Sequence, residues 1–169
     1  MEIIRTITDK DIGEKPRPVS KFNERKAARA ILFNKNKEVA IMTVAKFAYH
    51  KIPGGGVEEG EDLKTALERE IKEEAGATAK VTGELGRILE TRTEYPLKQE
   101  SFCFIAEAIN IGKPEFTDKE KEQGFSVSWM PINEAIKVFE KETPIEYSAK
   151  FMHLRDLCFL QEAKKRLGL

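Results

Sequence analysis

The chain has 169 residues, enough for one domain with a substantial core and short for two. Hydrophobic residues make up 40% and charged residues 34%, a composition typical of a folded protein with a charged surface rather than of a disordered chain. Lysine plus arginine and aspartate plus glutamate both total 29, which disfavours a protein that gathers nucleic acid through an overall basic field. We therefore expect a single domain over residues 1–169.

The N-terminus and the cysteines bear on the compartment. No run of about 18 apolar residues occurs, and the segment from Met1 to Pro18 alternates charge with aliphatic residues instead of forming a signal-peptide core. Cys103 and Cys158 lie far apart in apolar stretches, which suits buried reduced thiols better than a disulfide or a metal site. The sequence predicts no membrane segment and a cytoplasmic location.

The first elements in the chain form a predicted hairpin followed by a loop. Two apolar segments, residues 27–33 and 39–44, flank a polar turn at residues 34–37, a pattern that indicates two strands joined as a β-hairpin. The run Ile52-Pro53-Gly54-Gly55-Gly56 follows, and its glycines allow backbone geometry that other residues cannot adopt. We expect a loop there.

A helix over residues 61–75 is the clearest regular element, because its apolar residues recur at helical spacing and Gly76 is placed to end it. The apolar positions are Leu63, Ala66, Leu67, Ile71 and Ala75.

The rest of the chain shows no repeating strand–helix rhythm, which argues for an α+β fold, a mixed sheet covered by helices. The domain core is expected over about residues 24–142. The remaining predicted elements are strands over residues 85–93 and 101–109 joined by 94–98, a loop over 111–121, a strand over 125–129 ended by Pro131, a helix capped by Asn133 and running to Phe139, and a C-terminal helix over about 149–167.

Three glutamates mark one side of the predicted helix. Glu70, Glu73 and Glu74 stand at i, i+3 and i+4, so their carboxylates share a face and repel one another unless a cation neutralises them. Oxygen-only ligands favour Mg²⁺ or Mn²⁺ over zinc. Taken alone, such a cluster is also what a solvated helix face looks like.

The residues around the glutamates distinguish these two interpretations. Gly55, five residues, Glu61, seven residues and then the run from Arg69 to Ala77 together resemble the signature of the Nudix family. Ala77 is the one departure, since the family usually has a bulkier aliphatic residue there. The similarity extends over roughly residues 26–139, including His50-Lys51-Ile52-Pro53 before the glycines, and Gly124-Phe125 and Trp129-Met130-Pro131 after the helix.

The resemblance implies a fold and a metal site. It implies an α/β/α sandwich with a mixed sheet, in agreement with the order of elements. By position, Glu70, Glu73 and Glu74 would ligate the metal together with the backbone carbonyl of Gly54. Arg69 would pair with Glu61 and so hold the acidic cluster in place.

The implied chemistry is attack by a metal-polarised water on one phosphorus of a diphosphate, without an organic cofactor. The catalytic group would be Glu70, Glu73, Arg69 and Glu61. Glu70 is the first candidate for the base that accepts the proton of the water. Some family members use a glutamate from a later loop instead, where Glu120 or Glu122 would be the counterpart.

The resulting hypothesis is a Mg²⁺-dependent pyrophosphohydrolase of a small nucleotide: a dNTP, ADP-ribose, a nucleotide sugar or a dinucleoside polyphosphate. The alternative is a nucleotide-binding sensor of the same fold that cleaves nothing; it is disfavoured because no signature carboxylate is missing. Cleavage at an RNA end is disfavoured by the charge balance. The N-terminal segment and the C-terminal helix could supply the surface of a homodimer.

Several further side chains invite functional interpretations that compete with ordinary structural ones. His50 lies near the loop, but a structural role is the better prediction. Trp129 and Tyr95 could stack on a base, although strand ends and connections often carry such residues. The cationic candidates for phosphate contact are Arg87, Arg92 and Lys98, for which a solvated strand face is the default.

Overall fold

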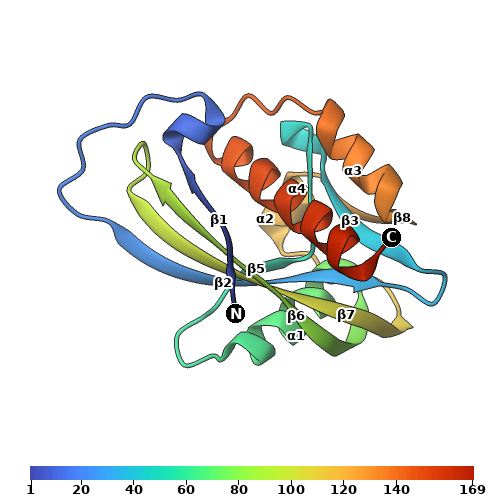
Figure 1. Ribbon diagram of the computed structural model, residues 1–169. Helices are drawn as coiled ribbons and strands as arrows, with labels where there is room; N and C mark the ends of the chain where they lie inside the picture. The colour runs from blue at the N-terminus through green and yellow to red at the C-terminus, as the bar shows by residue number, and fades with distance from the viewer.

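A mixed β-sheet runs through the middle of the computed structural model, which describes residues 1–169 (Figure 1). Its strands are β1 (Ile3–Thr8), β2 (Asn23–Phe33), β3 (Glu38–Val44), β4 (Tyr49–Lys51), β5 (Gly54–Gly56), β6 (Ala77–Arg92), β7 (Leu97–Ile111) and β8 (Phe125–Pro131). The main path has the order β1-β6-β7-β2-β3-β4, with β5 paired to β2 and β8 to β3. β1 runs parallel to β6 and β2 parallel to β7, while every other pair is antiparallel.

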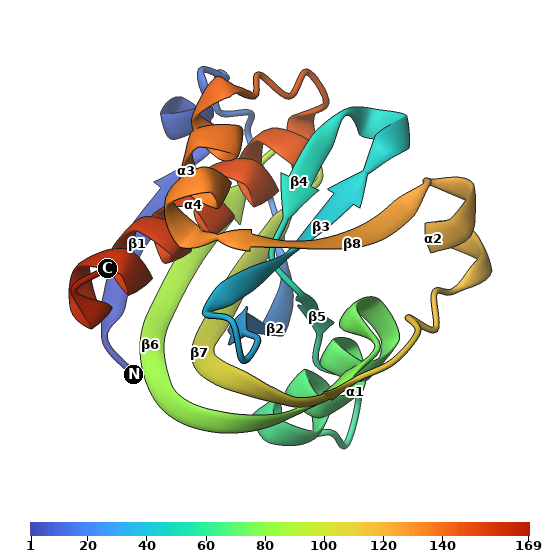
Figure 2. The ribbon, with the colours of Figure 1, turned by 90° about the vertical axis from the view of Figure 1, so that its right-hand side faces the viewer.

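Helices cover both faces of this sheet. They are α1 (Leu63–Ala75), α2 (Asp118–Glu122), α3 (Ile132–Lys141) and α4 (Tyr147–Leu167), with 3-10 turns η1 (Asp9–Ile12) and η2 (Ala45–Phe47). In Figures 1 and 2, α3 and α4 lie together on one side of the strands and α1 lies on the other. The predicted α+β fold with a mixed sheet and an α/β/α arrangement is confirmed.

Strand β2 divides the interior into two cores because successive side chains point to opposite faces. Ala28, Ala30 and Leu32 belong to the core under α1, and Ile31 and Phe33 to the core under α3 and α4. The buried members under α1 are Ala28, Ala30, Leu32, Ala40, Ala66, Leu67, Ile71, Ala75, Ala77 and Ala106. The core on the other face includes Ile7, Ile41, Leu85, Ile88, Phe139, Tyr147, Phe151, Phe159 and Leu160.

The predicted hairpin over residues 27–33 and 39–44 forms only at its turn. β2 and β3 pair antiparallel at Phe33 and Val39 and then separate. The glycine segment β5 takes the place beside β2, opposite Ala27 to Arg29, and β3 pairs along its whole length with β8. The hairpin prediction was therefore wrong beyond the turn, because both strands have other partners that are distant in the chain.

The predicted loop at residues 52–56 and the predicted strand at 85–93 also differ from the structure. Gly54–Gly56 form the short strand β5. The strand predicted at residues 85–93 is β6, which begins already at Ala77. Its pairing with β7 is interrupted by register shifts between Thr78 and Ala79, Val81 and Gly83, and Glu84 and Gly86. The first half of β6 still alternates between more and less buried positions, but Ala77, Ala79 and Gly83 are small residues that give only a weak apolar signal in the sequence.

The helix starts were predicted within a few residues of their positions. α1 begins at Leu63, because Asp62 caps it by accepting the Thr65 N–H at 2.7 Å. α3 begins at Ile132 after Pro131, so the cap predicted at Asn133 is wrong. β1 and the short helix α2, which lies across the end of the predicted loop 111–121, were not predicted.

Two of the broader expectations can be compared with the structure directly. Cys103 and Cys158 are free thiols, as predicted, but only Cys103 is buried, and its burial raises its pKa far above the ordinary value. Cys158 is half-buried. None of the helices combines the length with the apolar composition that crossing a membrane requires.

Candidate functional site

The glycine segment β5 lies directly against α1, and a Cβ added at two of its positions would overlap neighbouring atoms. A Cβ added to Gly55 would lie 2.2 Å from Glu70 Oε1. Gly54 has φ +134°, and a Cβ there would lie 2.3 Å from the Ala28 carbonyl oxygen. The loop therefore approaches the helix closely enough to bring its backbone next to the Glu70 carboxylate.

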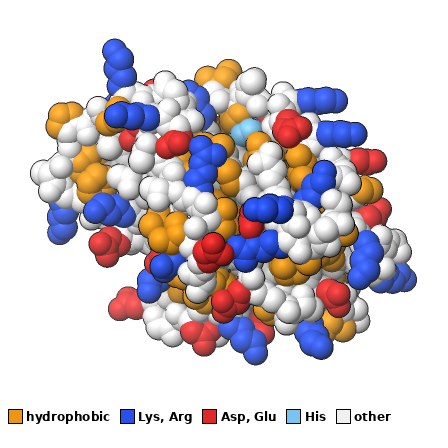
Figure 3. Space-filling model, viewed as in Figure 1, with side chains coloured by type: hydrophobic (Ala, Val, Ile, Leu, Met, Phe, Trp, Pro, Cys, Tyr) orange, Lys and Arg blue, Asp and Glu red, His pale blue; other side chains and the backbone are white.

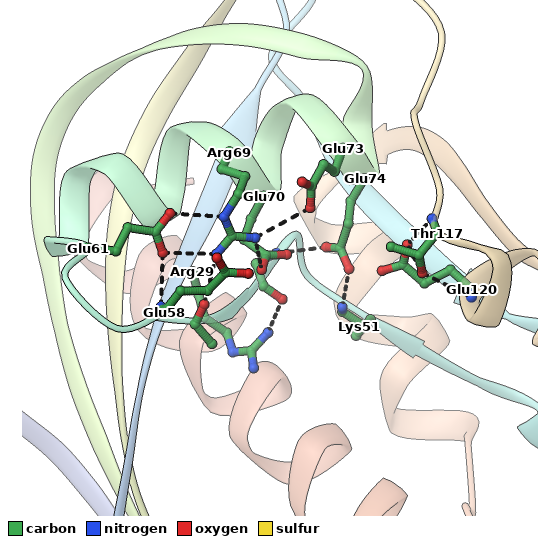
Figure 4. Close-up of polar contacts among 12 residues, drawn as sticks. Arg29, Lys51, Glu58, Glu61, Arg69, Glu70, Glu73, Glu74, Thr117 and Glu120 are labelled. Atoms are coloured by element: carbon green, nitrogen blue, oxygen red, sulfur yellow. Dashed lines mark hydrogen bonds and ion pairs between the residues drawn. The ribbon is translucent and has the colours of Figure 1, made fainter.

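Arg69 connects the loop to the acidic face of α1. Its Nε and Nη2 donate to the two carboxylate oxygens of Glu61 at 2.9 and 3.0 Å, and Nη2 also donates to the Gly56 carbonyl at 3.0 Å. Nη1 donates to Glu70 Oε1 at 2.8 Å and to Glu73 Oε2 at 3.3 Å. Figure 4 shows the guanidinium between Glu61 on one side and Glu70 and Glu73 on the other.

The predicted ion pair between Arg69 and Glu61 is thus present. The hydrogen bonds from Arg69, together with the Glu58 N–H, lower the pKa of Glu61, and the same pairing raises the pKa of Arg69. Both oxygens of Glu61 accept hydrogen bonds from Arg69, so this carboxylate holds the guanidinium in place. The Nη1 group of Arg69 remains available to donate to Glu70 and Glu73. The catalytic role of the pair stays a prediction.

Glu74 points into the protein rather than outward. It is 1% exposed; Oε2 accepts the Gly54 N–H at 2.8 Å, and Oε1 contacts the ammonium of Lys51. Burial raises the pKa of Glu74, and Lys51 opposes that shift. The carboxylate therefore joins α1, β4 and the start of β5.

The carbonyl of Gly54 faces a second buried cation. Arg29 on β2 donates from Nη1 to this carbonyl oxygen and is itself buried, which lowers its pKa to about 10. From α4, Asp156 accepts the Ile52 N–H at 3.0 Å and the Nε–H of Arg155 at 2.7 Å. Side chains from both β2 and α4 thus hold the residues that precede Gly55.

Sequence reasoning missed Arg29, Lys51 and Asp156. A signal exists for Arg29, which is the one charged residue in the apolar segment 27–33. Lys51 lies in the approach to the glycines, but nothing in its neighbourhood indicates that it will meet Glu74. Asp156 lies in the C-terminal helix, 104 residues from its partner Ile52.

The oxygen atoms at the site fit a hard divalent cation in their chemistry. Arg69 contacts one oxygen each of Glu70 and Glu73, and the other oxygen of each carboxylate accepts no hydrogen bond from the protein. Burial raises the pKa of Glu73, which lies close to the carboxylate of Glu70. Three or more such ligands do not converge on one point, because Glu74 is turned toward Lys51.

Of the two later glutamates, Glu120 lies on the side of the site. Its charge contributes to the raised pKa of Glu73, and Figure 4 shows it across from Glu74 and Lys51. Its Oε2 accepts the Thr117 N–H at 2.7 Å and the Thr117 hydroxyl at 2.9 Å, which closes the capping box of α2. Glu122 is exposed and makes no side-chain hydrogen bond.

His50, Trp129 and Tyr95 each contact other side chains of the protein. The Nδ1 of His50 contacts the carboxylate of Glu142, whose Oε2 lies 3.7 Å from Nε2 of His153. Trp129 packs at the rim of the core under α1. Tyr95 is 57% exposed at the turn between β6 and β7, with its ring 5.8 Å from that of Tyr147.

The basic side chains on β6 and β7 have protein partners as well. Arg87 pairs with Glu100 and Arg92 with the buried Glu90. Lys98 lies with its ammonium 5.2 Å from the ring centroid of Phe22.

A cavity of about 580 Å³ is lined by residues of β1, β2, β6 and β7 and by none of the glycine segment. One of its walls is Arg25, whose Nη2 lies 2.7 Å from the position that a Cβ on Gly56 would take. The lining residues are Thr6, Glu24, Arg25, Lys26, Leu89, Glu90, Thr91, Lys98, Gln99 and Glu100, among which none is aromatic. On the face seen in Figure 3, basic and acidic side chains are interspersed.

Residues 23–153 match the family model of the NUDIX domain. The chain is 29% identical over 124 residues to diphosphoinositol polyphosphate phosphohydrolase 2 of Rattus norvegicus, a match covering 72% of this chain and 66% of that protein. It is 30% identical over 132 residues to diphosphoinositol polyphosphate phosphohydrolase 3-alpha of Mus musculus, covering 75% of this chain and 77% of the relative.

Solved structures share the fold at lower sequence identity. A NUDIX hydrolase from Nitrosomonas europaea superimposes with a TM-score of 0.62 and 16% identity, over 85% of this chain and 90% of that one. A MutT protein from Methanosarcina mazei Go1 gives a TM-score of 0.60 and 16% identity, over 88% and 99% of the two chains.

Proposed function

Because the chain belongs to the Nudix family and is a Nudix-type hydrolase that acts on pyrophosphate bonds, we propose that Glu70 and Glu73 hold the divalent metal for this hydrolysis. Members of the family generally use divalent metals, and Mg²⁺ or Mn²⁺ is the ion that oxygen ligands favour. The observation that carries the proposal is the placement of both carboxylates on Arg69, beside the backbone of Gly55. Gly54 and Glu74, the other two ligands predicted from the sequence, have protein partners.

Glu70 has two tasks in the proposed reaction, as a metal ligand and as the base, and the other side chains have one each. When bound, the ion supplies the positive charge that polarises the attacking water and the phosphate oxygens. Glu70, with one oxygen fixed by Arg69 and the other open, accepts the proton of the water. Glu61 orients Arg69, so that the guanidinium holds Glu70 and Glu73 in place. Glu120 is the alternative base.

The cavity walled by Arg25 favours a densely phosphorylated substrate. Arg25, Lys26 and Lys98 line it without forming ion pairs, whereas Glu90 and Glu100 are neutralised by arginines. Open cations attract phosphate groups, and the absence of an aromatic wall leaves no platform on which a base would stack. We therefore propose diphosphoinositol polyphosphates, the compounds after which the two relatives are named, as the first substrates to test.

The nucleoside diphosphate derivatives predicted from the sequence form the second set of substrates. The signature determines which bond is cut, while the loops and the cavity around it determine what is attached to that bond. ADP-ribose, a nucleotide sugar, a dNTP and a diadenosine polyphosphate should be tested beside the diphosphoinositol polyphosphate.

Hydrolysis of this panel in Mg²⁺, in Mn²⁺ and in a chelator tests the proposal. We expect turnover that the chelator abolishes, and a loss of about 100-fold or more in kcat/KM on Glu73→Gln, because the ion loses a ligand. The matched control is Glu68→Gln, an exposed glutamate of the same helix that pairs with Lys64. Full activity of Glu73→Gln would contradict the metal assignment, and tight binding without turnover on every compound would support the sensor.

The cavity can be tested separately from the metal. Arg25→Gln should raise KM for the diphosphoinositol polyphosphate about ten-fold or more while changing kcat little, because it removes a proposed phosphate contact and leaves Arg69, Glu70 and Glu73 in place. Lys35→Gln, at the exposed turn between β2 and β3, is the control. An unchanged KM in Arg25→Gln would place the substrate elsewhere.

A further inference from the structure

A lysine is buried against one of the three clustered glutamates. Lys51 is 8% exposed and Glu74 1% exposed, and the Lys51 ammonium contacts Glu74 Oε1. The same ammonium lies 5.3 Å from the ring centroid of Phe125. Figure 4 shows Lys51 next to Glu74, away from Arg69 and Glu61.

We propose that Lys51 is a built-in cation that occupies the place of a metal ion beside Glu74, so that Glu74 positions the glycine segment and Glu70 and Glu73 hold the divalent metal. This inference rests on the proposed function, since it concerns how the same site is charged. It assigns Lys51 and Glu74 as positioning residues.

Both carboxylate oxygens of Glu74 already have partners in the protein. Oε1 meets the ammonium of Lys51, and Oε2 accepts the Gly54 N–H at 2.8 Å. The carbonyl of the same Gly54 accepts from Arg29. Both atoms that the family resemblance assigns to metal on this side of the site are therefore engaged by cations of the protein.

The charges of the cluster support the same division. Four carboxylates, Glu61, Glu70, Glu73 and Glu74, share two cations, Arg69 and Lys51. Arg69 forms ion pairs with the first three, whereas Lys51 forms one with Glu74 alone. A divalent ion near Glu74 would meet the ammonium at close range, and two like charges at contact distance in a buried place repel strongly.

The backbone around Lys51 keeps the side chain in place. Lys51 pairs with Met42 across β4 and β3, and the N–H of the next residue, Ile52, is held by Asp156. The backbone that carries the Lys51 side chain is therefore held close to Glu74. Phe125 closes the space next to it with the face of its ring.

Counting of bound Mn²⁺ tests the inference with a readout that does not depend on turnover. Electron paramagnetic resonance of free Mn²⁺ and calorimetry would be applied to the native protein, Lys51→Met, Glu74→Gln and the double variant. Lys51→Met should bind one more Mn²⁺ per chain than the native protein, because Glu74 then lacks its cation. Glu74→Gln alone should weaken Mn²⁺ binding about ten-fold, since the buried Lys51 loses its partner and disturbs the loop.

The double variant separates a positioning role from direct ligation. With both charges removed, the glutamine can still accept the Gly54 N–H, so Mn²⁺ number and affinity should return to within about three-fold of the native values. If Glu74 is itself a ligand, the double variant will bind as weakly as Glu74→Gln, and the inference is wrong. If Lys51→Met does not fold, the comparison of Mn²⁺ binding between Glu74→Gln and the double variant still tests the inference.

Two controls complete the experiment. Lys72→Met removes an exposed lysine of α1 that pairs with Glu115, and it should leave Mn²⁺ binding unchanged. Failure of the native protein to bind Mn²⁺ would contradict the proposed function. Native binding without any gain in Lys51→Met would overturn only the role of Lys51.

Discussion

The two faces of the sheet are packed with side chains of different size. Under α1 the buried residues are mostly alanines, whereas the face under α3 and α4 carries phenylalanines, tyrosine and isoleucines. Small side chains let a helix lie close to the sheet, and large ones fill volume and remove apolar area from water. The difference indicates that the α1 face sets the distance between the glycine segment and Glu70, while the other face supplies most of the hydrophobic stabilisation.

The largest expected effect lies on the aromatic face. Phe159 on α4 is fully buried, and Phe159→Ala should lower the free energy of unfolding by about 3–5 kcal/mol, because it loses apolar burial and leaves a cavity. Urea denaturation measures this change. Mn²⁺ affinity of the folded fraction should be unchanged, and a parallel loss of affinity would contradict the separation of the two faces.

A smaller change in stability but a direct change in the site is expected at Gly55. In Gly55→Ala the added Cβ would clash with the carboxylate of Glu70, so Glu70 or the loop must move. We expect kcat/KM to fall roughly 100-fold, the usual consequence of displacing a catalytic group by about 1 Å. Gly83→Ala, where a Cβ would meet nothing within 4 Å, is the matched control.

Overpacking the α1 face should give the smallest loss of stability. Ala66 is fully buried between α1 and the sheet, and Ala66→Leu should cost about 1–3 kcal/mol as the helix shifts outward. Because that shift moves Glu70 and Glu73, Mn²⁺ affinity should fall even where thermal unfolding shows the protein folded. Unaltered affinity would mean that α1 does not set the geometry of the carboxylates.

How much of the molecule could be predicted depends on the sequence distance between interacting residues. The residues that Arg69 joins, from Gly56 to Glu73, fall within one short stretch of the chain, so the family resemblance carried over by position predicted the Arg69–Glu61 pair. Arg29 reaches Gly54 across 25 residues and Asp156 reaches Ile52 across 104. Contacts of that kind depend on tertiary packing and leave no periodic pattern in the sequence.

The fold class could be predicted because it depends on patterns within single segments of the chain. The pairing of the strands could not, because it depends on contacts between segments. Apolar periodicity indicates that residues 27–33 form a strand, but it does not say which strand will lie beside it. Adjacency in the sequence favoured residues 39–44, and the glycine segment displaced them. β1 escaped prediction because Ile7 is its one fully buried residue, which leaves little apolar alternation to detect.

The parallel pairing of β2 with β7 also affects the order in which the parts of the protein fold. β6 and β7 are joined by a short turn and can form their ladder as soon as both exist, whereas β2 must wait for a partner whose first paired residue is Leu97. α1 lies between them in the chain and packs on β2, so its docking surface is completed late. We expect pulse-labelled hydrogen exchange during refolding to protect β6 and β7 before β2. The hydrolytic site would then be among the last parts of the protein to assemble.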